Sequence, residues 1–411
     1  MRQAWGGLLL WSAALSAIAA GAQDHWPGVL HEHPAIQYSV GPTSDRVAKL
    51  SEALARGTRS FERDARTGYL LPVLNALGLS VDSQLLVFSK TGVQRALINP
   101  QNPRALFFDE SVVVGYVPGA PLLELAAHDP QQGVLFYTLD QGAASPSLTR
   151  RTSCLACHVS ASTLEVPGML ARSNAVDDGG NVLPQLGSND VTHLTPHPDR
   201  WGGYYVTTET TALGYNQRAH AGNITFSGNG NTSNQVFIDW LNSSPETHGY
   251  LSGSSDIVAL QAFDHQMHAI NLITRLNWES RVAAPDATMR RLERELADYL
   301  LFVGEVPPSA ALTPPSGFSR SLEVRTPKDH LGRSFAQIDA ADRLLRYPCS
   351  YMIYSQAFDG LPAEIKQAVY RRMLDVLSND APRAPGTAHV TADDRRAVLE
   401  ILRETKADFP G

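Results

Sequence analysis

Five short stretches of β-branched and aromatic residues follow one another between residues 84 and 140, and they constrain the fold more than any other feature of the sequence. They read QLLVFSK, ALFFD, SVVVGYV, LLELAAHD and VLFYTLD, and Asn, Pro, Gly and Asp residues separate them. β-Branched and aromatic side chains suit a pleated, half-buried surface, whereas the separating residues favour turns. The pattern therefore predicts the strands of a small antiparallel sheet or barrel-like layer.

Apolar residues recur at helical spacing on both sides of this predicted sheet. Residues 43–57 and 67–79 are expected to form two helices before it. After residue 254 the helical period returns, and the expected helices cover residues 255–281, 287–304, 361–378 and 391–406. These patterns predict an α+β protein that begins with a mixed helix and antiparallel-sheet region and ends in a helical C-terminal half.

The first 22 residues have the layout of a secretory signal peptide. A leader with one arginine precedes the apolar run LLLWSAALSAIAA, and Ala20-Gly21-Ala22 supplies small residues for cleavage. This layout predicts a periplasmic or secreted protein, and the alternative is a retained N-terminal anchor helix. The run is short for a bilayer and no other segment has 18 apolar residues, so we expect no stable membrane span.

The most informative motif is Cys154-Leu-Ala-Cys157-His158. A spacing of three residues puts both sulfurs on one face of a helical turn, and the adjacent histidine can turn a ring nitrogen onto a metal. Haem c uses these groups, because two thioether bonds join it to cysteine sulfurs and a histidine binds its iron. The motif occurs once, so we expect one covalent haem c, anchored by Cys154 and Cys157, with His158 as an iron ligand.

Three other uses of these cysteines fit the sequence less well. A structural zinc site needs four ligands, and no second pair with suitable spacing lies nearby. A thioredoxin-like dithiol needs a strand before the motif and a helix after it, which the flanking residues do not indicate. A disulfide would leave His158 unexplained. The third cysteine, Cys349, is expected to be a buried free thiol.

The residue on the other face of the iron is less well defined. Met169 follows the motif by eleven residues, although a core methionine after a Pro-Gly turn is the simpler interpretation. His193 and His220 are further candidates, and the alternative role of His193 is a hydrogen bond to the backbone. An open sixth position on the iron is the remaining alternative.

His265 and His268 lie three residues apart on one predicted helix and therefore share a face. Two histidines on a mostly apolar helix are costly unless a polar partner or a metal satisfies them. Both are candidate iron ligands, and the alternative is a buried pair that is hydrogen-bonded to Asp264 or Asn271. A second, noncovalent haem on the remaining histidines is left open.

An aromatic stretch, RWGGYY, begins at Arg200 and Trp201. Trp201 can pack against the edge of a porphyrin, and Arg200 can pair with a haem propionate. We therefore count both as cofactor-binding candidates. The alternative is an aromatic strand with a Gly-Gly bulge.

At the CLACH motif the chain resembles c-type cytochromes. Nearly the whole chain is also similar to a poorly characterised family of exported bacterial mono-haem proteins. This resemblance rests on LLVFSKTGVQ, PRALFFDESVVVGYVPG, SCLACHVS with VPGMLARS, RWGGYYVT, HAGN, DHQMHAINLITR and YPCSYMIYSQAFDGLP. It implies haem c, an envelope location and a cytochrome c-like haem-binding segment. It also implies His193, His220, His265 and His268 as site residues without an assigned role.

The expected organisation is a signal peptide over 1–22, an α+β region over 23–145, a haem c-binding region over 146–306 and a helical region over 307–411. The function expected first is electron transfer to a periplasmic redox partner protein. A haem enzyme with an open distal face is the second hypothesis, because one haem needs only about a hundred residues around it. A haem-based sensor or an envelope scaffold is the third. The net charge of −7 disfavours binding to nucleic acid.

Overall fold

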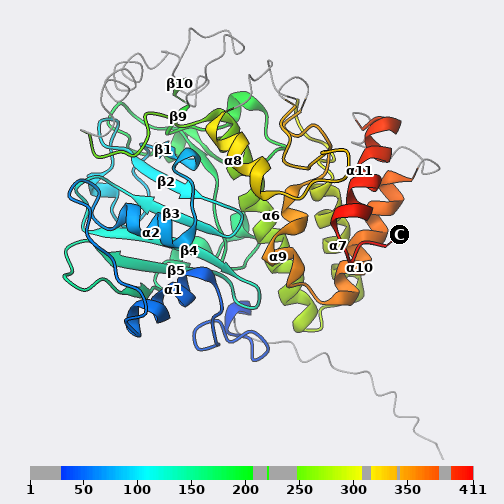
Figure 1. Cartoon of the computed structure of the whole chain (residues 1–411), viewed down its shortest axis with the longest axis horizontal. Helices are drawn as coiled ribbons and strands as arrows, with labels where there is room; N and C mark the ends of the chain where they lie inside the picture. Colours follow the sequence, from blue (N-terminus) through cyan, green and yellow to red (C-terminus); the bar gives the residue numbers. More distant parts are fainter. Residues whose placement is uncertain are drawn as a thin grey trace, which may run out of the picture.

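The computed structural model describes residues 29–206, 220–221, 248–307, 316–339, 343–378 and 390–410. Its largest element is an eight-stranded sheet with the order β10-β9-β1-β2-β3-β4-β5-β6, in which every neighbouring pair is antiparallel (Figure 1). Its strands are β1 Leu85–Val87, β2 Arg104–Phe108, β3 Val112–Tyr116, β4 Leu122–Asp129, β5 Gly133–Asp140, β6 Leu148–Arg150, β9 Tyr204–Val206 and β10 His220–Ala221.

The predicted α+β class is confirmed, and the five predicted strands correspond to β1 to β5. The sheet also takes in β6, β9 and β10, which come from residues after 145. The expected regions 23–145 and 146–306 therefore share one sheet. A separate two-stranded sheet pairs β7 Arg172–Asn174 with β8 Ser188–Asp190.

Side chains alternate between the two faces of the large sheet, and each face contributes to its own core. Phe107 lies in the core that includes α1 Arg46–Ala55 and α2 Leu70–Leu77. Its neighbour Phe108 lies in the core on the opposite face, which includes α6 Ile257–Arg281. Both faces are covered, which explains why the strands read as nearly continuous apolar runs.

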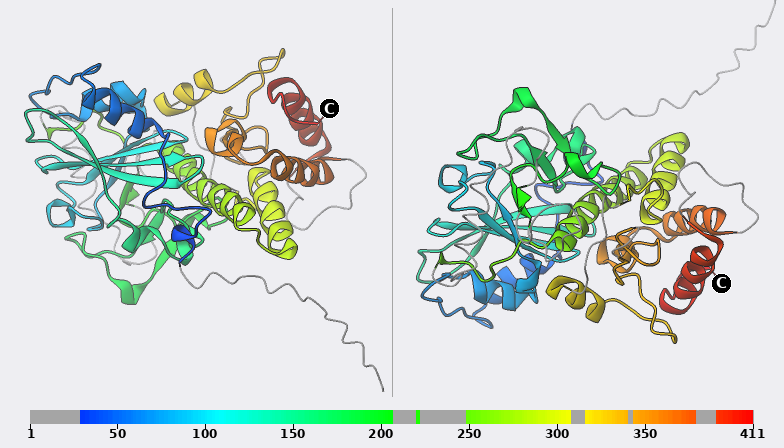
Figure 2. Two further views of the ribbon diagram at one scale, coloured as in Figure 1. Left: turned by 90° about the horizontal axis from the view of Figure 1, so that it is seen from below. Right: turned by 90° about the horizontal axis from the view of Figure 1, so that it is seen from above.

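α6 connects the sheet with the C-terminal half. Asp256 starts this helix by accepting a hydrogen bond from the N–H of Ala259, as expected for an aspartate at this position. Most residues of α6 are buried, because the helix lies between the sheet and α7 Asp286–Leu300 (Figure 2). The helix predicted over 255–281 is confirmed.

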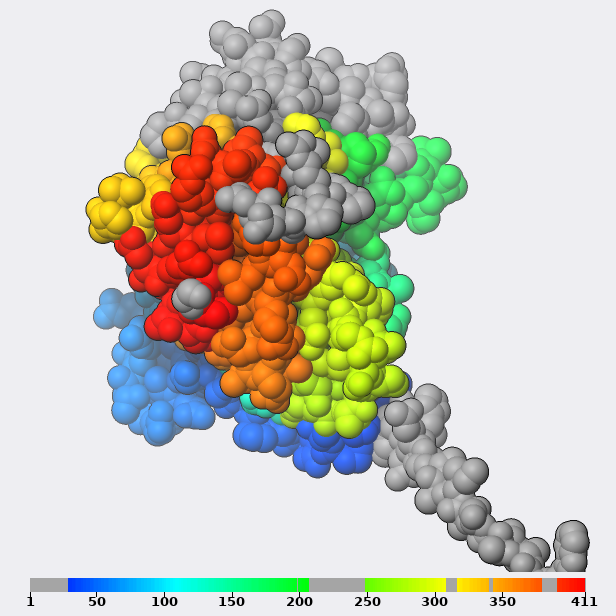
Figure 3. All heavy atoms as spheres, turned by 90° about the vertical axis from the view of Figure 1, so that its right-hand side faces the viewer, coloured from blue at the N-terminus to red at the C-terminus, as the bar shows by residue number. Residues whose placement is uncertain are grey.

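The C-terminal half is helical, as predicted. Besides α7 it contains α8 Gly317–Arg325, α9 Gln356–Asp359, α10 Ala363–Leu377 and α11 Ala392–Thr405. α7, α10 and α11 lie next to one another on the face of the molecule seen in Figure 3. Cys349 is a buried free thiol in this half, which confirms the expectation. Among the described residues, no helix has the length and apolar character needed to cross a membrane.

Short helical turns make up most of the remaining ordered connections. They are α3 Leu155–His158 and the 3-10 helices η1 Leu30–Glu32, η2 Val81–Ser83, η3 Arg95–Leu97, η4 Ala161–Thr163, η5 Pro184–Leu186, η6 His197–Asp199 and η9 Tyr351–Tyr354. The signal peptide predicted over 1–22 lies outside the described residues.

Candidate functional site

The CxxCH motif folds into a single helical turn shortly after β6, an edge strand of the sheet. The backbone N–H groups of Cys157 and His158 both donate to the carbonyl oxygen of Cys154, at 3.1 Å. Cys154 is half-buried, Cys157 is exposed, and both are free thiols. The two sulfurs project from positions one helical turn apart, so they lie on the same side of α3.

The imidazole of His158 is held by the backbone ten residues further on. Its Nδ1 atom lies 2.9 Å from the carbonyl oxygen of Gly168, and the N–H of Gly168 donates to the carbonyl of His158 at 3.0 Å. A carbonyl oxygen only accepts, so Nδ1 carries the proton and Nε2 keeps the lone pair that can bind a metal. Burial lowers the pKa of His158, which favours this neutral form.

The surroundings of the His158 ring combine apolar contact with nearby positive charge. Phe136 of β5 packs against the ring, with 4.5 Å between the centroids. Arg104 of β2 and Arg172 of β7 lie close enough that their charges lower the pKa of His158 further. Arg104 forms an ion pair with Glu124 at 3.7 Å, and Arg172 forms one with Asp190 at 3.0 Å. Neither arginine is predicted as a site residue from the sequence.

Gly168 and Met169, which follow the motif, are fastened to α6. The side-chain oxygen of Asn271 accepts a hydrogen bond from the N–H of Met169 at 3.0 Å, and its amide nitrogen donates to the carbonyl of Met169 at 2.9 Å. A Cβ atom on Gly168 would lie 2.3 Å from the oxygen of Asn271, so only glycine fits. The side chain of Met169 is buried in the core between the sheet and α6.

The geometry of the turn weakens the alternatives to haem. Within the described ranges, the only group of three or more metal-ligating side chains that converge on a point is Asp329, His330 and Glu404, and the CxxCH residues are not part of it. Burial raises the pKa of the Cys154 thiol, whereas a redox-active dithiol needs a stabilised thiolate. The helix after Cys154 is a single turn.

Comparisons with known proteins add no second line of evidence. No family model, curated protein or solved structure matches the chain. The interpretation of the site therefore rests on its own residues and their geometry.

His193 and His265 meet in the core between α6 and the segment that follows α7. Their Nδ1 atoms are 2.9 Å apart, and the Nε2 atom of His265 lies 2.6 Å from the hydroxyl of Ser350. The rings of Tyr299 and Phe302 stack on His265 at centroid distances of 4.9 and 4.4 Å. Burial lowers the pKa of His265 to about 3, so this imidazole is neutral.

Arg200 and Trp201 make protein contacts in the same core. The indole N–H of Trp201 donates to the carboxylate of Asp264 at 2.8 Å. Arg200 is buried and donates to the carbonyl oxygens of Thr195 and His193, at 2.7 and 3.1 Å. Asp264, considered above as a partner of the histidines, is therefore hydrogen-bonded to Trp201. Arg200, which we expected to pair with a propionate, is hydrogen-bonded to backbone carbonyls instead.

The remaining histidine candidates, His268 and His220, lie on different elements of the structure. His268 is half-buried on α6 and packs against the ring of Tyr299, 4.9 Å between centroids. Burial lowers the pKa of His268 to about 4, and the nearby charge of Asp190 acts in the opposite direction. His220 pairs with Val206 across β10 and β9, while its side chain lies outside the described residues.

Three polar residues of α6 lie on one face of that helix, namely Asp264, His268 and Asn271. Their spacing of four and then three residues is visible in the sequence and would have identified this face. Ser350 and Tyr299 gave no such signal, because they meet His265 only through the packing of the C-terminal half. The same holds for Arg104 and Arg172, which reach the CxxCH turn from distant strands.

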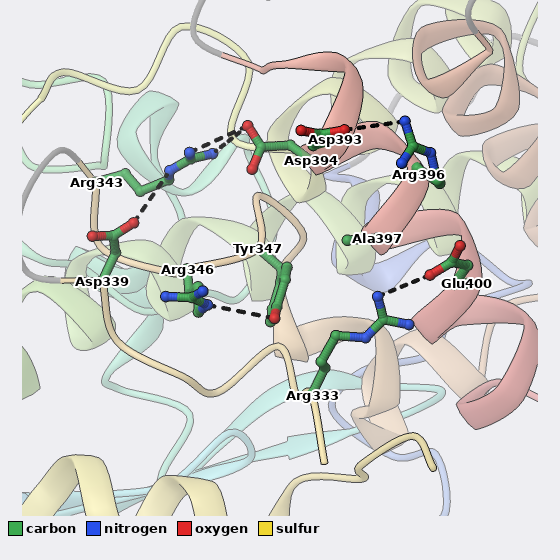
Figure 4. A pocket seen from close by; sticks show the side chains of 10 residues that line it. All are labelled: Arg333, Asp339, Arg343, Arg346, Tyr347, Asp393, Asp394, Arg396, Ala397 and Glu400. Atoms are coloured by element: carbon green, nitrogen blue, oxygen red, sulfur yellow. Dashed lines mark hydrogen bonds and ion pairs between the residues drawn. The ribbon is translucent and has the colours of Figure 1, made fainter. Parts of the chain in front are cut away.

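A second candidate is a hollow of about 480 Å³ that lies between α11 and the residues 333–339 and 343–347 (Figure 4). Four arginines and four carboxylates line it, and most of them neutralise one another. The ion pairs are Arg343 with Asp339 and Asp394, Arg333 with Glu400, and Arg396 with Asp393. The guanidinium of Arg346 lies over the ring of Tyr347. We interpret the hollow as a structural contact that fastens α11.

Proposed function

We propose that this chain is an exported mono-haem c-type protein that transfers single electrons to a periplasmic redox partner. Cys154 and Cys157 would hold the haem through thioether bonds, and Nε2 of His158 would bind its iron. The observation that carries the proposal is the hydrogen bond between Nδ1 of His158 and Gly168, because it presents the other ring nitrogen as a ligand beside two free thiols.

The residues around the turn suit a porphyrin. A half-buried and an exposed thiol on one side of a helical turn can reach neighbouring vinyl groups, and Phe136 supplies apolar contact at the histidine. Arg104 pairs with Glu124 at 3.7 Å and Arg172 pairs with Asp190 at 3.0 Å, so each would exchange this carboxylate for a haem propionate. Haem bound here supplies a one-electron iron couple, and the polypeptide sets its potential through the histidine and its surroundings.

The positions of the candidates narrow the choice of a sixth ligand. The backbone of Met169 lies on the Nδ1 side of His158, behind the ring and away from the iron-binding nitrogen. His193 and His265 are bonded to each other and packed between aromatic rings, so neither can turn toward a haem without opening the core. We therefore infer that His268, His220 or an open position faces the iron.

A haem enzyme remains the second candidate function. The observation that favours it is that His193 and His265 are bonded to each other instead of facing the CxxCH turn, which is compatible with an open distal face. The two functions differ in the absorption spectrum of the ferrous protein with and without carbon monoxide. A shift on adding carbon monoxide supports an open or displaceable position, and an unchanged spectrum supports simple electron transfer.

The proposal is tested by single substitutions in a host that attaches haem c. Cys157→Ser should leave at most one thioether bond and lower the yield of covalent haem. His158→Ala should keep the covalent haem but give a high-spin iron. Cys349→Ala is the matched control. Cys349 is a buried free thiol far from the motif in the sequence, so its replacement should leave the haem content and the spin state unchanged. Normal haem content and spectra in both motif variants would contradict the proposal.

Export is tested separately. The proposed signal peptide predicts that the mature protein begins at Gln23 and is found in the periplasm or the medium. N-terminal sequencing of the protein from its native host decides this. An intact Met1 on the haem-loaded protein would contradict export with cleavage.

A further inference from the structure

We propose that Asn271 of α6 is a positioning residue for His158 and that it controls how strongly this histidine binds haem iron. The inference rests on the proposed haem site. Asn271 would not touch the haem. It acts through the peptide group that joins Gly168 to Met169.

That peptide group has a partner on each side. Its carbonyl oxygen, which belongs to Gly168, accepts the hydrogen bond from Nδ1 of His158 at 2.9 Å. Its N–H, which belongs to Met169, donates to the side-chain oxygen of Asn271 at 3.0 Å. One peptide group therefore connects the imidazole to the side chain of Asn271. The side-chain amide of Asn271 is held in its plane by a second hydrogen bond, which its nitrogen donates to the carbonyl of Met169.

The connection has an electronic consequence. Hydrogen bonds that share an amide polarise one another, so the bond to Asn271 makes the Gly168 oxygen a stronger acceptor. A stronger acceptor draws the proton of Nδ1 away from the ring and makes Nε2 a better electron donor to a metal. A better donor stabilises the ferric state, so Asn271 should lower the reduction potential of the haem.

Close packing around the peptide group holds its two hydrogen bonds in place. Asn271 and Met169 are both buried, so water does not replace the bonds between them. Gly168 has no space for a side chain, because a Cβ atom would lie 2.9 Å from the Cβ of Thr163 as well as against Asn271. Most residues of α6 are buried, and the helix gives Asn271 a fixed base.

The test compares three variants of the haem-loaded protein. Asn271→Leu removes both hydrogen bonds, whereas Asn271→Asp keeps the acceptor for the N–H of Met169. The control is Asn277→Leu, because Asn277 is buried on the same helix but donates to the carbonyls of Pro130 and Gly360, away from His158. The measurements are the reduction potential and the NMR resonance of the Nδ1 proton of His158 in the ferrous protein.

We expect Asn271→Leu to raise the potential and to move the Nδ1 proton upfield. Asn271→Asp should keep the potential at or below that of the wild type, and Asn277→Leu should leave both properties unchanged. If Asn271→Leu does not fold, a raised potential in Asn271→Asp overturns the inference by itself. Equal shifts in the two Asn271 variants, a shift in the control, or no shift in Asn271→Leu would also overturn it. A wild-type protein without covalent haem would instead refute the proposed function.

Discussion

The indole N–H of Trp201 donates a 2.8 Å hydrogen bond to the buried carboxylate of Asp264, in the core that α6 shares with the sheet. Burial raises the pKa of Asp264 to about 7, and the nearby Arg200 and the bond from Trp201 only partly oppose this effect. The folded protein therefore holds a proton on Asp264 at pH values where the unfolded chain has lost it. This group makes the stability of the protein depend on pH.

The first prediction concerns Asp264→Asn. The raised pKa contributes stability that is fully present below pH 4 and is lost as the pH rises through about 7, and the loss is on the order of a few kcal/mol. Asparagine keeps an oxygen for Trp201 but does not titrate. Urea unfolding of both proteins at pH 4 to 8 should therefore show the variant gaining stability relative to the wild type as the pH rises. A constant difference across this range would contradict the assignment.

The second prediction concerns the buried histidine pair. His265→Leu leaves the hydroxyl of Ser350 and Nδ1 of His193 without their bonds to His265, which should cost about 2–4 kcal/mol at pH 7. The pKa of His265 is lowered, so its contribution is present above pH 6.5 and is lost as the pH falls toward 3. The variant should thus lose less stability than the wild type on acidification. The exposed His330→Gln is the control and should change stability by less than about 0.5 kcal/mol.

The third prediction tests the close contact behind the CxxCH turn. Gly168→Ala places a Cβ atom 2.3 Å from the oxygen of Asn271, which should destabilise the fold by about 1–3 kcal/mol and disturb the bond from His158. Gly142→Ala is matched to it, because the nearest atom to its Cβ would be 3.4 Å away. Thermal unfolding of the two variants should separate them clearly. Similar melting temperatures would mean that the contact at Gly168 relaxes without cost.

The fourth prediction concerns the ion pairs that fasten α11. Arg343 and Asp394 are mostly buried and 3.2 Å apart, so Arg343→Met should cost about 1–3 kcal/mol. Arg396 and Asp393 form a pair of similar length, 3.0 Å, on the exposed side of the same hollow. Arg396→Met should therefore cost less than about 0.5 kcal/mol. Equal effects in urea unfolding would contradict the interpretation of the hollow as a structural contact.

The sequence predicted the elements of the fold well where local patterns are strong. The strands over 104–140 and the helix over 257–281 were visible because composition and period act over a few residues. The pairing of β9 with β1 was not, since it joins Tyr204 to Val87 across more than a hundred residues. No local pattern encodes such a contact.

Of the candidate site, the sequence indicated the motif residues but not the residues that hold them in place. The CxxCH spacing made Cys154, Cys157 and His158 site candidates, because a helical turn fixes their relative positions. The partner of the imidazole, Gly168, carries no side chain that signals its role. Asn271 was noted only as a partner for histidines, since a buried amide on a helix does not reveal which backbone it binds.

The most direct test of the proposal that haem is covalently attached is the intact mass of the denatured protein purified from its native host, read together with its pyridine haemochrome spectrum. We predict the mass of the processed chain plus one haem, and a haemochrome band of the kind given by haem with two thioether bonds. A mass equal to that of the polypeptide alone, with no haemochrome band, would contradict the proposal.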